Sequence, residues 1–225
     1  MFVQTINKKI GIAYSIGLLS VVFLCSCNKS EIANNVPLAN EDETGKQFFT
    51  EKQELAEWSN NSEEIVKTRK MGDFVFTLKQ VTSDMMALQE LQGEISNEAK
   101  YNEAKSHYTD LFYFKLNIQN EKCQSELLKY QLETPEQYKE RIKYCSFELN
   151  KDVILVSGKD TIPCALHEFE RTFNIQSGLN FLVTFKRTDA PNGFSVVLHD
   201  QLFKQGLIKF NYKTNPNELP YLKIK

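Results

Sequence analysis

The side chains that could support chemistry are few, and the histidines come first. The chain has three, His107, His167 and His199. His167-Glu168-Phe169-Glu170-Arg171 has the His-Glu start of a zinc-protease helix, a motif that needs a second histidine one turn later. Arg171 occupies that position, and a cation there would repel a metal ion. The segment therefore predicts an exposed helix face with internal ion pairs.

Two further arrangements could support hydrolysis. Glu168 and Glu170 could act as the paired carboxylates of a glycoside hydrolase. His199-Asp200 follows an apolar strand, where catalytic groups are often found. The sequence has no serine in a Gly-x-Ser-x-Gly turn and no glycine-rich loop that would cradle a phosphate. We therefore expect a protein without catalytic residues, cofactor or metal, and we keep a hydrolase that uses His199 or the two glutamates as an alternative.

The cysteines after the N-terminal region suggest packing or cross-linking. Cys123, Cys145 and Cys164 form neither a Cys-x-x-Cys motif nor a Cys/His cluster, so a structural zinc site is not expected. Their number is odd. Two readings stay open: one disulfide between two of the three with one free thiol, or three buried thiols.

The N-terminal region has the layout of an export signal. Lys8 and Lys9 are followed by an apolar run from Ile10 to Leu24, shorter than the ~20 residues that a membrane-spanning helix needs. Leu24-Cys25-Ser26-Cys27 closes the run and resembles the lipobox of bacterial lipoproteins, which reads apolar, small, small, cysteine. Cys25 is a less usual residue at its position.

The resemblance implies that Cys27 is lipidated. Diacylglyceryl transfer to its thiol, cleavage before it by signal peptidase II and acylation of the new amine would anchor the protein to a membrane. Residues 1–26 would then be the signal peptide. Asn28, where some bacteria place an aspartate as a retention signal, favours the outer membrane over the inner membrane.

Charge gives no reason to expect a nucleic-acid partner. The chain has 27 basic and 29 acidic residues, and loss of Lys8 and Lys9 with the signal leaves a net charge of about −4. Residues 27–46 are polar and lack apolar periodicity, which predicts a flexible tether behind Cys27. Residues 47–225 have the length of one domain with a real core.

Helices are predicted from caps and from apolar spacing. Thr50-Glu51-Lys52-Gln53 and Thr134-Pro135-Glu136-Gln137 both have the form of a capping box, and the second also has proline at the first helical position. Further helices are expected at 83–91 and, as a solvated helix or loop, at 97–107. Leu166, Phe169 and Phe173 predict two short helical turns.

Strands are predicted where apolar residues alternate with polar ones. The segment 111–118 is the most hydrophobic and should be central, whereas Pro163 favours an edge position for its strand. The loop 188–193 is predicted to be the turn of a hairpin. The tail from Asn215 to Lys225 is predicted to lack regular secondary structure. The expected strands are 73–81, 111–118, 144–149, 153–156, 161–164, 179–186, 194–198 and 208–212.

The sequence therefore predicts an α+β domain weighted toward β, an antiparallel sheet or sandwich with a few short covering helices. Its expected role is a lipid-anchored, non-enzymatic binding or assembly module with an envelope protein or glycan as partner. The alternatives are the hydrolase and a structural subunit of an envelope assembly that pairs through exposed strand edges. Asp160-Thr161-Ile162 resembles a short bacterial O-glycosylation signal.

Overall fold

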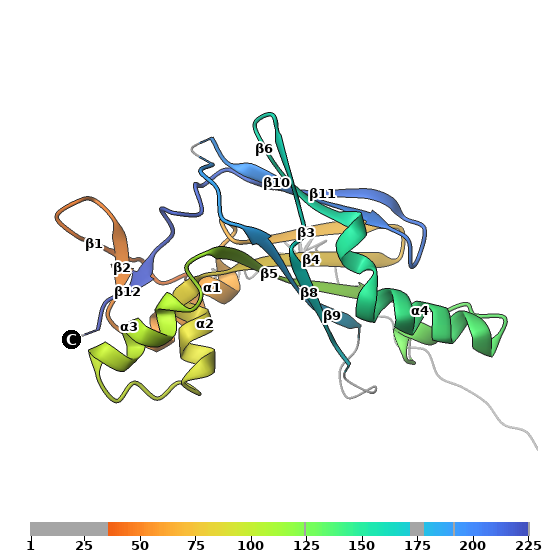
Figure 1. The fold of residues 1–225 in the computed structure, drawn as a ribbon, viewed down its shortest axis with the longest axis horizontal. Coiled ribbons are helices and arrows are strands. Elements are labelled where there is room, and N and C mark those ends of the chain that lie inside the picture. The colour runs from red at the N-terminus through yellow and green to blue at the C-terminus, as the bar shows by residue number, and fades with distance from the viewer. Residues whose placement is uncertain (1–35, 124, 172–177, 191, 225) are drawn as a thin grey trace, which may run out of the picture. The chain divides into compact units, whose positions relative to one another are not determined.

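The five-stranded antiparallel sheet is built around β5, in the order β3-β4-β5-β9-β8 (Figure 1). In this computed structural model, which describes residues 36–123, 125–171, 178–190 and 192–224, β5 is central as predicted. Its even-numbered residues from Phe112 to Ile118 are buried, because alternate side chains of a strand share one face. The strands are β3 (Val66–Met71), β4 (Phe74–Val81), β5 (Leu111–Asn120), β8 (Leu166–Glu170) and β9 (Leu179–Lys186).

A second antiparallel sheet of four strands has the order β11-β10-β6-β7. Pro163 lies in the edge strand β7, as predicted. An edge strand has a partner strand on one side only, so it can accommodate a residue that lacks an N–H donor. Thr161 is exposed on the same strand. The strands are β6 (Val153–Ser157), β7 (Asp160–Pro163), β10 (Phe194–Asp200) and β11 (Gly206–Tyr212).

The two sheets pack on each other through a single aromatic-rich core. The Phe194 and Tyr212 rings of the four-stranded sheet stack at 4.7 Å, and Phe114 of β5 meets Phe194 at 5.8 Å. The Tyr212 hydroxyl donates to the Leu78 carbonyl oxygen at 2.9 Å, so the one polar atom of this buried ring is satisfied across the core. At one side of the sandwich the Arg69 Nε atom of β3 donates to the Lys209 carbonyl oxygen of β11 at 3.0 Å.

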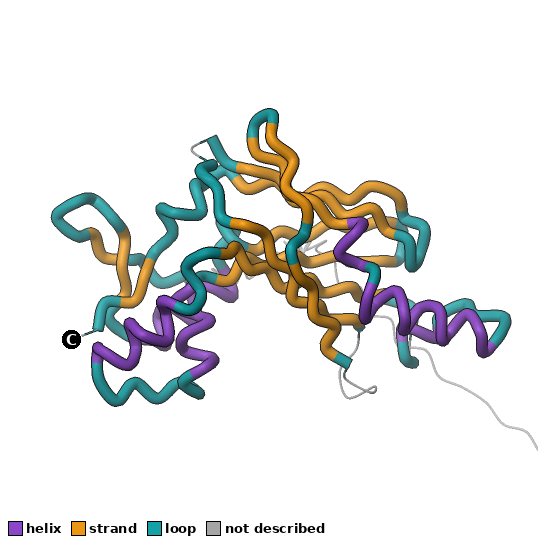
Figure 2. The backbone as a smooth tube through the Cα atoms, viewed as in Figure 1, coloured by secondary structure: helices purple, strands orange, loops and turns teal. Residues whose placement is uncertain are grey.

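The helices gather at two places, as Figure 2 shows. Three of them form a second buried cluster with the small sheet described below, centred on Leu55, Trp58 and Tyr101. The fourth, α4, lies against β8, where the His167 Nε2 atom is 2.9 Å from the Cys145 carbonyl oxygen. The helices are α1 (Lys52–Asn61), α2 (Ser83–Glu90), α3 (Glu98–Ser106) and α4 (Pro135–Phe147), with the 3₁₀ turns η1 (Leu127–Lys129) and η2 (Leu149–Asp152).

A small sheet joins both ends of the described chain. β2 (Gln47–Phe49) pairs antiparallel with β1 (Asn40–Glu41) and parallel with β12 (Tyr221–Leu222). Part of the expected tether, from Val36 onward, therefore packs on the domain, and the tail is not irregular throughout. Each of these strands has only two or three residues, too few for a strand pattern, so their pairing with one another gives them strand structure.

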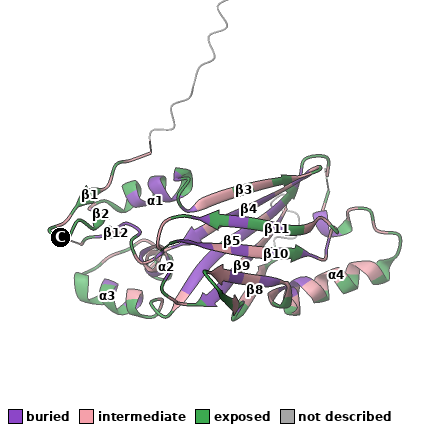
Figure 3. Ribbon diagram, turned by 90° about the horizontal axis from the view of Figure 1, so that it is seen from above, coloured by how far each residue is buried: buried purple, intermediate pink, exposed green. Residues whose placement is uncertain are grey.

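Residues 34–225 form one compact unit. Within it the described residues define an α+β domain weighted toward β, with two packed sheets, as the sequence predicts. Figure 3 shows buried residues concentrated on the strands and exposed residues on α3, on α4 and along β11. Across the described residues, none of the helices combines the length and apolar character required to cross a membrane.

Two of the helix predictions concern caps. At Thr134 the capping box forms: its side chain accepts from the Gln137 backbone, and Pro135 is the first helical residue. At Thr50 the prediction is wrong. Because β2 runs to Phe49, helix α1 begins later, with Glu51 at the N-cap position and no side-chain cap. Pairing with the small sheet decides where this helix starts.

Three further predictions are wrong. Residues 144–147 continue α4 instead of forming a strand, because Cys145 extends the buried side of that helix. Leu166 and Phe169 lie in β8, where the Phe169 ring stacks on Phe181 of β9 at 5.0 Å; Phe173 lies outside the described residues. The loop 188–193 makes no hairpin, since it carries the chain from one sheet to the other.

Candidate functional site

The outer face of the five-stranded sheet, opposite the shared core, carries a ladder of polar side chains. Asn117 of β5 donates to the Asn180 side chain of β9 at 2.6 Å, and Thr68 and Thr77 are linked at 3.2 Å on β3 and β4. The register places these four residues in one row across the sheet, which ends at Glu170 of β8. Such a row stabilises the sheet and leaves hydrogen-bonding groups toward solvent.

The neighbouring row contains an unfavourable pair. Lys79 of β4 and Lys115 of β5 are direct cross-strand partners. Directly opposed like charges destabilise a sheet, since their Cβ atoms are only about 5 Å apart. No ion pair links either lysine to a carboxylate anywhere in the described part of the chain. The two ammonium groups thus concentrate positive charge on this face.

Two adjoining hollows meet at Lys115 and Gln89, whose side chains are 3.4 Å apart. The hollow toward α1, of about 210 Å³, lies between α1, α2 and the sheet. The hollow toward β8, of about 260 Å³, is bordered by Met86 of α2 and by Glu168 and Glu170. The outer face thus has a basic end beside the helices and an acidic end at β8.

Lys79 is held firmly at the basic end. Its Nζ atom donates to the Asn60 side-chain oxygen at 2.6 Å and to Ser59 Oγ at 3.2 Å, both on α1. Burial lowers the pKa of Lys79 to about 8, and the charge of Lys115 acts in the same direction. The structure therefore keeps a cation here against both desolvation and repulsion.

The histidines do not form a common cluster. His107 follows α3 and faces Glu90 at 3.3 Å; His167 bonds to the backbone of α4 from β8; His199, at the end of β10, is 2.9 Å from the Gln201 side chain. Each has local partners in a different element. Throughout the described residues no group of three or more His, Cys, Asp or Glu side chains could hold a metal ion.

His199-Asp200 is not a catalytic pair, because neighbouring strand residues point to opposite faces. His199 is exposed, whereas Asp200 is buried. The Asp200 carboxylate accepts from the backbone N–H groups of Leu202, Phe203 and Gln205 at 3.0 to 3.3 Å. Its role is to close the turn between β10 and β11.

The candidate carboxylates are placed differently from the expectation. Glu168 and Glu170 lie on one side of an extended edge strand, not on a helix face, and both are exposed. They do border the hollow toward β8. Asp160-Thr161-Ile162 lies apart from them, in β7 of the other sheet.

Cys123, Cys145 and Cys164 are free thiols. Cys145 and Cys164 are buried in the shared core, and burial raises the pKa of both, that of Cys145 to about 12. Buried thiols with a raised pKa stay protonated and act as small apolar side chains. Cys123 is partly exposed and donates to the Ser125 carbonyl oxygen at 3.3 Å. The lipobox with Cys27 lies outside the described residues.

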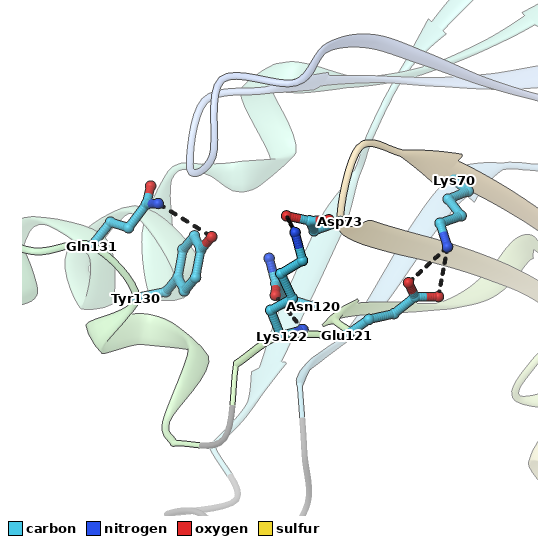
Figure 4. A network of polar contacts seen from close by, with 7 residues as sticks. All are labelled: Lys70, Asp73, Asn120, Glu121, Lys122, Tyr130 and Gln131. Carbon is cyan, nitrogen blue, oxygen red and sulfur yellow. Dashed lines mark hydrogen bonds and ion pairs between the residues drawn. The ribbon is translucent and has the colours of Figure 1, made fainter.

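A polar network at the far end of the five-stranded sheet is structural (Figure 4). Lys70 pairs with Glu121 at 2.7 Å, and Lys122 pairs with Asp73 at 3.0 Å, which ties the β3–β4 turn to the end of β5. All four side chains are at least 40% exposed, so each pair contributes little. The Asn120 side-chain oxygen accepts the Lys122 N–H at 2.9 Å.

The lysine pair is not predicted by the sequence alone. The alternation in each strand predicts that Lys79 and Lys115 avoid the core, but the chain between the two strands is too long for its turn to set the register. The sequence does show one relevant feature, which is a lysine at a position that faces away from the core in each of the two strands. Only the pairing of β4 with β5 makes them neighbours.

The class of protein that fold and site define is a β-rich α+β domain with a hollowed polar sheet face. No protein-family model matches the chain, and no curated protein matches it. A solved structure that it resembles is the crystal structure of a DUF4426 family protein from Pseudomonas aeruginosa PAO1, at 9% sequence identity and a TM-score of 0.34. The alignment covers 68% of this chain and 95% of that one. A likeness this distant carries no argument about function.

Proposed function

We propose that the chain is a lipid-anchored protein of the cell envelope whose domain is a non-enzymatic binding module. Leu24-Cys25-Ser26-Cys27 supports the anchor, with Cys27 as the acylated residue. The side chains around the lysine pair support a binding role. They are hydrogen-bonded amides, a hydroxyl and fixed charges, which can fix the orientation of a partner.

The outer face of the five-stranded sheet is the observation that carries the binding role. It combines ordered amide groups, charges of both signs at opposite ends and hollows against α2. Specific recognition uses such groups to fix orientation beside apolar contacts. The partner that we propose is an envelope protein or glycan, at the outer membrane rather than the inner membrane, and not a nucleic acid.

The anchor is tested by metabolic labelling with radioactive palmitate. The wild-type protein should carry label, and Cys27→Ala should carry none. Cys25→Ala is the matched control and should keep the label, because its cysteine is the neighbour that cleavage removes. Label on Cys27→Ala would contradict the assignment of the lipobox.

The binding role is tested by retaining envelope components on the immobilised full chain. A component that uses the outer face should be lost when Asn117→Arg places a long cation in the polar row, and it should be kept by Lys159→Glu, in the β6–β7 turn of the other sheet. Equal retention by both variants would remove the outer face as the binding surface.

A second candidate, an envelope hydrolase, has one observation in its favour: Glu168 and Glu170 border the same hollow. His199 lies in the other sheet and would not join them. Hydrolysis of envelope glycans by the wild type that is lost in both Glu168→Gln and Glu170→Gln would favour this candidate. Unchanged hydrolysis in both variants would remove it.

A further inference from the structure

The hollow toward α1 is amphipathic in a way that the general binding role does not explain. Its polar side holds the two lysines with Ser59, Asn60 and Gln89. Its apolar side consists of Leu55, Ala56, Val81, Met85 and Leu88, from both helices and the end of β4. Cations therefore stand at the border of an apolar recess.

The charge pattern selects the sign of a ligand. Two ammonium groups that lack carboxylate partners among the described residues would be relieved by one anion that contacts both, since charge-assisted hydrogen bonds are strong. Lys79 already donates to two side chains of α1, which fixes its ammonium group with one N–H remaining. An anion that binds to Lys79 would therefore find the ammonium group already ordered.

Two carboxylates on this face favour one orientation of the ligand, whereas its other two lysines, Lys70 and Lys186, lie in more distant rows. Glu168 and Glu170 lie at the opposite end, and Leu182 of β9 stands between Lys115 and Glu168 in the row. These carboxylates would repel an anionic group placed in the hollow toward β8. The anionic group therefore belongs at the lysines, with the rest of the ligand directed between α1 and α2.

The apolar recess suits a flexible chain. Met85 and Leu88 are only partly buried although they pack against the cluster of the three helices. Methionine side chains adapt to ligands of irregular shape. A volume of about 210 Å³ is below that of a typical drug-sized pocket, so it fits an anionic head group with a short apolar segment.

We propose that this hollow binds an anionic amphiphile, whose carboxylate or phosphate lies between Lys79 and Lys115 and whose apolar part lies against Met85 and Leu88. The inference goes beyond the proposed function, because it adds an anionic amphiphile as a ligand of the outer face beside the envelope protein or glycan. It requires no chemical step. A carboxylate and a phosphate share the chemistry that the lysines recognise, and the probes below distinguish them.

The test is residue-specific acetylation of lysines, read by peptide mass spectrometry on the full chain in neutral detergent. Decanoate, decyl phosphate and decanol are the probes. Either anion should slow acetylation of Lys79 and Lys115 about tenfold at saturation, and decanol should not. The anion that slows acetylation of the two lysines more at equal concentration has the preferred head group. Lys70 and Lys122, at the far end of the sheet, are internal controls that should keep their rates.

Three results would overturn the proposal: no protection by either anion, equal protection by decanol, or equal slowing at Lys70 and Lys122, which would indicate micelle charge. A thermal-melting series gives a second measurement. Decanoate should raise the melting temperature of the wild type and of Lys70→Met, but not that of Lys115→Met or Lys115→Gln. A rise in both Lys115 variants contradicts the site. Neither experiment depends on palmitate labelling or on partner retention, so failure here leaves those two results standing.

Discussion

Asp84 is the buried charge that joins three segments of the domain. It is 3% exposed and accepts from the Tyr101 hydroxyl at 2.5 Å, from Lys105 at 2.7 Å and from the Leu222 N–H at 3.0 Å. The carboxylate thus links α2, α3 and β12. Burial and the neighbouring carboxylate raise the pKa of Tyr101, which keeps its hydroxyl protonated as the donor.

We expect Asp84→Asn to lower the free energy of unfolding by about 3 kcal/mol, because it leaves Lys105 without its partner and replaces an acceptor by a donor. Urea denaturation measures the change. Glu121→Gln, which breaks the exposed pair with Lys70, is the control and should cost less than about 1 kcal/mol. Equal effects in the two variants would contradict the role of burial.

Lys79 should make stability depend on pH. Its pKa is lowered from 10.5 to about 8, so the unfolded chain binds this proton more tightly than the folded chain. The free energy of unfolding should therefore rise as the pH increases from about 8 toward 10. Comparison of the wild type with Lys79→Met over that range isolates the contribution. Parallel profiles for the two proteins would show that the pKa of Lys79 is not lowered by folding.

At the scale of elements, the two capping-box sequences provide a matched pair. Thr134→Ala removes a side chain that accepts from the Gln137 N–H at 3.4 Å, whereas Thr50 caps no helix. We expect Thr134→Ala to cost about 1 kcal/mol and Thr50→Ala to cost clearly less. Chemical denaturation of both variants tests this, and a larger loss for Thr50→Ala would place the start of α1 where the sequence alone predicts it.

The elements also show why several assignments could not be made from local sequence. Leu166 and Phe169 have helical spacing, but the free edge of β9 makes them a strand. Residues 144–147 have apolar content that suits a strand, but the helix that Thr134 starts continues through them. In both cases a neighbour in space or an earlier start overrides a weak local preference.

At the scale of the whole molecule, the C-terminal segment closes the second buried cluster. Leu222 is 3% exposed, and Ile224 packs against the same cluster. We expect deletion of residues 221–225 to lower the free energy of unfolding by at least about 3 kcal/mol, because it removes these contacts and a donor to Asp84. Urea denaturation measures the loss. Lys223→Ala is the control, and a similar loss there would contradict the role assigned to Leu222.

The sequence by itself determined the features that depend on local pattern. The apolar residues at every second position from Phe112 to Ile118 determined β5 and its buried face, the capping box determined the start of α4, and Pro163 determined an edge strand. The lipobox prediction also depends only on neighbouring residues. These signals lie within one element, so distance along the chain does not weaken them.

Only the tertiary structure decided the features that depend on register and on contacts between distant segments. It placed Lys79 opposite Lys115, sent the loop 188–193 from one sheet to the other, and gave the short segments at both ends of the domain a shared sheet. The physical reason is that a strand pattern defines which residues share a face but not which strand lies beside it. The candidate site arises from that choice of neighbours.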